Sequence, residues 1–89
     1  MITLDVLSHE VMLELSSLLE ANHPECVNMH EDELFADKGL DSIDMSTILM
    51  EIESKYDLTL STKHLLGITC QRDFVKIMSE AILEKRNSL

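Results

Sequence analysis

Aromatic residues are the scarcest class in this chain of 89 residues, at 3%, with one Tyr, two Phe and no Trp. The interior must therefore be filled by Leu, Ile, Val and Met, which suits packed helices better than a β-sandwich. Glycine and proline are also few, since only Pro24, Gly39 and Gly67 interrupt the chain, and no two alternating runs are joined by a hairpin turn signal. We therefore expect an all-α fold.

Positive charge is scarce as well, with 7 Lys and Arg against 17 Asp and Glu and a formal net charge of −10. Such a charge repels nucleic acid and anionic membrane surfaces, and it favours partners that present Lys and Arg. No stretch approaches the apolar run of about 18 residues that spans a membrane, and the first residues lack the basic and apolar regions of a signal peptide. We expect a cytoplasmic, monomeric protein that binds no nucleic acid and has no membrane span.

Signals for a disulfide or a metal site are weak. The two cysteines, Cys26 and Cys70, show no paired-motif spacing, and in a reducing compartment they are expected to be thiols. The histidines and acids of residues 23–32 lack the tight spacing of a zinc site, and the aspartates of residues 37–44 do not follow the calcium-loop pattern. We therefore expect no resident metal, and we expect His23, Cys26 and His30 to lie in a solvated loop.

At this length the chain predicts a single domain, residues 1–89, with one modest core. Apolar spacing of three and four predicts a helix from Leu4 to about Ala21, ended by Pro24, and a second helix from Ser42 to near Lys55 or Asp57. A brief helical turn is expected within residues 61–66, and a last helix follows Cys70 and ends near Arg86. The prediction is a four-helix bundle with a long first loop and a short third helix.

The same spacing predicts which side chains fill the interior of the bundle. Most of them lie on the inner faces of the expected helices, and Leu34 and Phe35 are expected to tether the first loop to the core. The predicted core residues are Leu7, Val11, Leu15, Leu18, Leu34, Ile48, Ile52, Tyr56, Leu60, Ile68, Val75 and Met78.

The start of the second helix carries the strongest functional signal. Asp41 suits the N-cap, and Asp44 three residues later completes a capping-box-like pair, so Ser42 opens the first turn. Free N–H groups and the positive dipole end of a helix stabilise a phosphate attached there, although serine is also common at such positions for capping alone. A hydrolase nucleophile is not expected, because the chain lacks a Gly-x-Ser-x-Gly elbow and no histidine has a recognisable partner motif.

The sequence Gly39-Leu40-Asp41-Ser42-Ile43-Asp44 resembles the attachment motif of acyl carrier proteins, usually Gly-x-Asp-Ser-Leu-Asp, and the similarity runs without a gap from about Phe35 to Met78. The resemblance implies that Ser42 bears a covalent 4'-phosphopantetheine from coenzyme A, with Asp41 as the neighbouring acid. The protein would then be no enzyme but a carrier of thioesters in fatty-acid, polyketide or mixed polyketide and nonribosomal peptide biosynthesis. Its partners would be a phosphopantetheinyl transferase, which supplies Mg²⁺ at its interface, and an acyltransferase, ketosynthase or related synthase.

The resemblance also implies that partner enzymes recognise the second helix. Its acids would face basic docking patches on those enzymes and would set the orientation of binding more than its affinity. Ser46 and Thr47 depart from the usual apolar and acidic residues, so partner preference is expected to differ from that of a housekeeping fatty-acid carrier. Two alternatives stay open: an aminoacyl carrier, and a carrier-like interaction subunit whose Ser42 is never modified. The expected partner-recognition residues are Ile43, Asp44, Met45, Ile48, Met50, Glu51 and Glu53.

Overall fold

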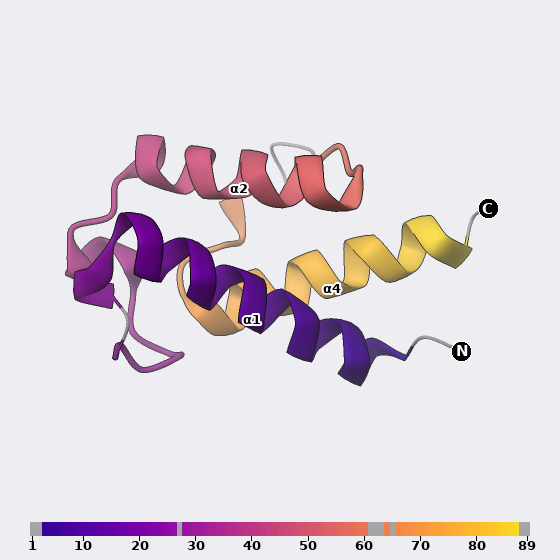
Figure 1. Ribbon diagram of the computed structural model, residues 1–89, viewed down its shortest axis with the longest axis horizontal. Coiled ribbons are helices and arrows are strands. Elements are labelled where there is room, and N and C mark those ends of the chain that lie inside the picture. The colour runs from indigo at the N-terminus through magenta and orange to yellow at the C-terminus, as the bar shows by residue number, and fades with distance from the viewer. Residues whose placement is uncertain (1–2, 27, 61–63, 65, 88–89) are drawn as a thin grey trace.

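The computed structural model describes residues 3–26, 28–60, 64 and 66–87, and the named elements in this part of the chain are all helical. Three α-helices, α1 (Leu4–Asn22), α2 (Ser42–Tyr56) and α4 (Gln71–Asn87), are joined by loops that contain the short 3₁₀ turns η1 (Pro24–Cys26) and η2 (Phe35–Lys38) (Figure 1). The all-α expectation is confirmed. The predicted short third helix falls on residues 61–66, most of which lie outside the described residues, so the count of four helices stays a prediction.

Helix α1 begins and ends where side-chain chemistry dictates. The Thr3 hydroxyl caps its N-terminus by accepting a hydrogen bond from the Val6 N–H at 3.3 Å. At the other end the Asn22 side-chain amide donates to the Leu18 carbonyl, and Pro24 prevents the helix from continuing. The helix buries a stripe of Leu7, Val11, Leu15 and Leu19, as its spacing predicts.

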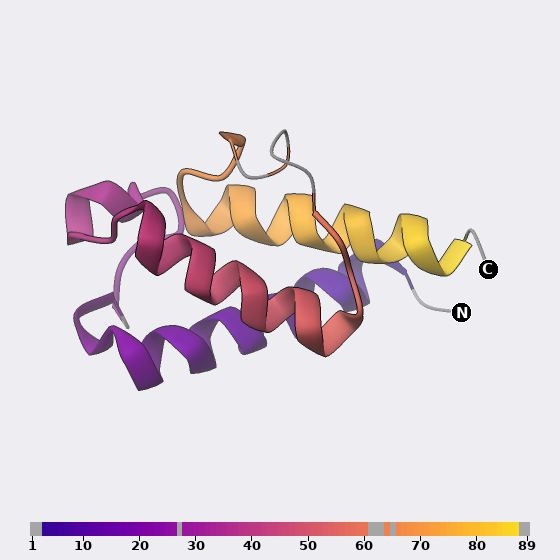
Figure 2. The same cartoon turned by 90° about the horizontal axis from the view of Figure 1, so that it is seen from above.

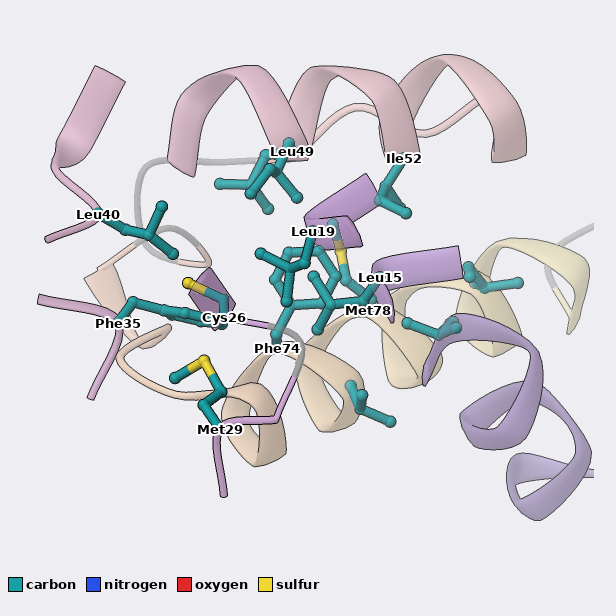
Figure 3. Close-up of a cluster of buried hydrophobic side chains, with 14 of the residues drawn as sticks. Leu15, Leu19, Cys26, Met29, Phe35, Leu40, Leu49, Ile52, Phe74 and Met78 are labelled. Carbon is teal, nitrogen blue, oxygen red and sulfur yellow. The ribbon is translucent and has the colours of Figure 1, made fainter. Parts of the chain in front are cut away.

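The core lies where α1 and α4 pack together and α2 covers them. Figure 3 shows Leu15 and Leu19 of α1 beside Phe74 and Met78 of α4, with Leu49 and Ile52 entering from α2. Each fully buried side chain of this size contributes about 1.5–3 kcal/mol through removal from water. The hydrophobic core therefore fixes α2, and with it the start of α2, relative to the other two helices.

Most of the predicted core is confirmed. Leu18, Tyr56, Leu60 and Ile68 are only partly buried but pack against the core, and the rest of the set apart from Leu34 is buried. Residues outside the predicted set also belong to it: Leu19, Cys26, Met29, Phe35, Leu40, Leu49, Phe74 and Ile82.

Leu34 is the one core prediction that is wrong, because its side chain is 45% exposed. Its backbone is extended, with φ −72° and ψ 135°, and it forms an isolated antiparallel bridge with Cys70. In an extended backbone adjacent side chains point in opposite directions, so Phe35 turns inward, at 3% exposed, and Leu34 turns outward. Phe35 therefore tethers the first loop to the core (Figure 3).

None of the helices in the described part of the chain has the length and apolar character needed to cross a membrane. Cys26 and Cys70 are both buried and unpaired, and burial raises the pKa of the Cys26 thiol. Within the described ranges no three His, Cys, Asp or Glu side chains converge as a ligand set for a metal ion.

Candidate functional site

The first turn of α2 is held by a complete capping box. The Asp41 carboxylate accepts a hydrogen bond from the Asp44 N–H at 2.9 Å, and the Asp44 carboxylate accepts one from the Asp41 N–H at 3.1 Å. The hydrogen bond from the Asp44 N–H holds the pKa of the Asp41 carboxyl below its usual range. The predicted cap is confirmed, and it places Ser42 as the first residue of the helix.

The chain reaches this cap through a tight turn after η2. Gly39 has φ 83°, in the left-handed region, and its N–H donates to the Ala36 carbonyl at 3.1 Å. Leu40 then donates its N–H to the Phe35 carbonyl and buries its side chain, which is 5% exposed. This anchor next to the cap fixes the position of Ser42 while leaving its side chain exposed.

A groove of about 230 Å³ opens directly beside Ser42. Its lining is mostly apolar and comes from the first loop, the first turns of α2 and the segment before α4. The lining residues are Leu34, Phe35, Ala36, Leu40, Asp41, Ser42, Met45, Ile68 and Thr69.

The residues at this position fit a covalently attached phosphopantetheine. Ser42 offers an exposed hydroxyl at a helix N-terminus, where the unpaired N–H groups of the first turn favour an attached phosphate. The Asp41 and Asp44 carboxylates lie at the same helix end and would repel a free anion, so a phosphate at this position would need a covalent bond to stay in place. The apolar groove offers a surface to the carbon chain that follows the phosphate.

The expected partner-recognition residues do not all reach the surface of α2. Ile43 and Met50 are 73% and 67% exposed and present apolar side chains to solvent. Glu51 is exposed, and Met45 is half-buried at the groove. Ile48, which the sequence also places in the core, is 2% exposed and fills the core, so it offers no surface to a partner.

The two remaining acids of the set are tied into the structure. Asp44 is half-buried and forms the capping box, and the Glu53 carboxylate accepts the Leu60 N–H at 3.4 Å, which joins α2 to the segment that follows it. Among the three acids expected to recognise partners, Glu51 is therefore the one whose side chain is exposed.

His23 lies near the site although the sequence gives no sign of it. Its Nε2 atom is 3.8 Å from the Asp44 carboxylate, and its Nδ1 atom is 3.7 Å from the Glu25 carboxylate. The side chain is 18% exposed and joins the end of α1 to the first turn of α2. Spacing in the sequence places His23 in a solvated loop, and only the packing of two helices brings it to the capping box.

The family model described as the phosphopantetheine attachment site matches residues 9–78 of the 89. Comparisons with curated proteins and with solved structures give no match. The matched range covers most of α1, the first loop, the whole of α2 with Ser42 at its start, and the first half of α4. The chain therefore belongs to the phosphopantetheine-attachment family of carrier domains, which carry a covalently attached 4'-phosphopantetheine.

Proposed function

We propose that Ser42 is the attachment residue and that the protein carries acyl groups as thioesters between the enzymes of fatty-acid, polyketide or mixed polyketide and nonribosomal peptide biosynthesis. The observation that carries this proposal is the exposed Ser42 at the first position of α2, held between Asp41 and Asp44 in a complete capping box. An aminoacyl group is carried by the same chemistry and is the nearest alternative cargo.

The phosphopantetheine supplies the thiol that bears the acyl group. The chain supplies the attachment site and the surface that partner enzymes recognise. As the Ser42 Oγ bonds to the phosphorus of coenzyme A that bears the pantetheine, the hydroxyl must lose its proton and the pyrophosphate bond must break, so that adenosine 3',5'-bisphosphate leaves. Asp41, the acid beside it, is a poor base for this proton, because its carboxylate already accepts the Asp44 N–H and its pKa is lowered. We expect the transferase to supply both the base and the Mg²⁺.

The exposed face of α2 is the proposed surface for the transferase, acyltransferase and ketosynthase or related synthases. Ile43 and Met50 lie one and eight residues after Ser42, and both are largely exposed, so a partner that takes up Ser42 meets them on the same helix. The net charge of −10 steers basic partners toward the molecule at long range. We further propose that the chain acts as a monomeric, single-domain carrier in the cytoplasm and catalyses no reaction itself.

The test is the intact mass of the purified protein before and after incubation with coenzyme A, Mg²⁺ and a broad-specificity phosphopantetheinyl transferase. We expect one phosphopantetheine addition to the natural protein and none to Ser42→Ala. Ser46→Ala is the matched control, because Ser46 is an exposed serine one turn later on the same helix, and it should be modified as the natural protein is.

Two results would overturn the proposal. Modification of Ser42→Ala would place the attachment elsewhere on the chain. No addition with several transferases would favour the interaction subunit, in which α2 docks a partner without covalent modification.

A further inference from the structure

The first loop is joined to the start of α4 by a short run of backbone contacts. The Phe35 N–H donates to the Thr69 carbonyl at 2.9 Å, and the Arg72 N–H donates to the Glu31 carbonyl at 3.0 Å. Between them Leu34 and Cys70 form the antiparallel bridge. Figure 2 shows the loop passing beside the start of α4, so segments far apart in the sequence lie side by side.

The Arg72 side chain adds hydrogen bonds across this junction, to carboxylates of the first loop. Its Nε and Nη2 atoms lie 2.6 and 3.2 Å from the two carboxylate oxygens of Asp32, and Nη2 also lies 2.5 Å from the Glu31 carboxylate. A guanidinium that binds a carboxylate through two parallel hydrogen bonds fixes orientation as well as distance. We call these contacts the Arg72 clamp.

The clamp adds little to the stability of the fold. The Arg72 side chain is 58% exposed and its partners are 45% and 54% exposed, and ion pairs in such surroundings contribute little net free energy. The property that distinguishes it from an ordinary surface ion pair is its bidentate geometry, which constrains the two segments that it joins.

These segments are the two walls of the groove beside Ser42. Leu34, Phe35 and Ala36 form one wall, and Ile68 and Thr69 form the other. The clamp holds Glu31 and Asp32, just before the first wall, against Arg72, just after the second. Without the Arg72 side-chain contacts, the walls stay joined by the Phe35–Thr69 hydrogen bond and the Leu34–Cys70 bridge, and we expect their separation to be less narrowly fixed.

We propose that Arg72 is a positioning residue that sets the separation of the two groove walls, so that the first carbon units of the phosphopantetheine arm lie between them. These units, next to the phosphate, include a quaternary carbon with two methyl groups, which suits the apolar lining of the groove. This inference rests on Ser42 as the attachment residue.

The experiment compares backbone amide NMR spectra before and after phosphopantetheine is loaded onto the natural protein and onto Arg72→Gln and Arg72→Lys. In the natural protein we expect loading to shift the amide signals of Ala36, Ile68 and Thr69 as well as those of Asp41 and Ser42. In Arg72→Gln the shifts at the walls should be lost and those at Asp41 and Ser42 kept. Arg72→Lys keeps the charge without the planar fork, and it should restore only part of the wall shifts.

Lys55→Gln is the matched control, because Lys55 is 54% exposed and pairs with Glu14 between α2 and α1, away from the groove. It should keep all the shifts of the natural protein. Wall shifts that are unchanged in Arg72→Gln, or that are lost equally in Lys55→Gln, would overturn the role of Arg72. Failure of the natural protein to take up the arm would instead overturn the proposed function, so the two failures are distinguishable.

Discussion

At the scale of single residues, the path of the chain into Ser42 depends on the left-handed conformation of Gly39, at φ 83°. A Cβ at this position would meet nothing within 4 Å, so the cost of a side chain is conformational and not a clash. We expect Gly39→Ala to lower the free energy of unfolding by about 1–2 kcal/mol. Gly39→Asn should lose less, because asparagine enters the left-handed region more readily. Urea denaturation measures both, and equal losses would contradict this account.

The pair Leu34 and Phe35 marks the limit of what the sequence predicts for single residues. In helices the apolar spacing assigns inward positions, and Leu7, Val11 and Leu15 are buried as predicted. In the first loop no period exists, so the sequence cannot tell which of two adjacent apolar residues faces inward. The bridge between Leu34 and Cys70 orients the two side chains, and it depends on a segment 36 positions further along the sequence.

At the scale of elements, the capping box determines where α2 begins. We expect Asp41→Ala to lower the free energy of unfolding by about 0.5–2 kcal/mol, because the Asp44 N–H loses its acceptor. Asp41→Asn should keep nearly all of the stability, since an amide oxygen also caps a helix. Chemical denaturation measures the stability, and a large loss in Asp41→Asn would show that the charge matters and not the cap.

The same pair of variants separates the cap from the attachment reaction. If the cap alone positions Ser42, Asp41→Asn should be modified at the rate of the natural protein and Asp41→Ala more slowly. A similar loss of rate in both variants would mean that the transferase reads the Asp41 charge.

Element boundaries were predicted well wherever local chemistry sets them. The first helix is expected over residues 4–21 and ends at Asn22 just before Pro24, and the second begins at Ser42 because Asp41 and Asp44 cap it. The Arg72 clamp could not be predicted, because it joins residues 40 and 41 positions apart, and the groove could not be predicted, because separate segments of the chain line it. Nothing in the spacing of Asp32 and Arg72 indicates that packing brings them together.

At the scale of the whole molecule, several of the few cations join separate elements. Lys55 pairs with Glu14 between α2 and α1, and Lys85 lies 3.1 Å from the Asp57 carboxylate at the end of α2. Arg72 joins α4 to the first loop. The remaining acids give the molecule its net negative charge, which favours encounter with basic partners and lowers stability through self-repulsion.

The acids also predict how the molecule responds to low pH. Four carboxyl groups accept hydrogen bonds that lower their pKa values in the folded state. Asp32 accepts from the Arg72 side chain and Asp73 from the Thr69 side chain. Glu33 accepts from the His30 N–H and Asp41 from the Asp44 N–H. The unfolded chain therefore takes up protons first as the pH falls, and the free energy of unfolding should decrease below about pH 4 and be nearly constant above about pH 5. Urea unfolding at several pH values in ~0.5 M NaCl, which screens the self-repulsion, measures this loss. In Arg72→Gln the free energy of unfolding should fall less on acidification, because Asp32 has lost its hydrogen-bond donor. A natural protein whose stability is unchanged or rises down to about pH 3 would contradict the lowered pKa values.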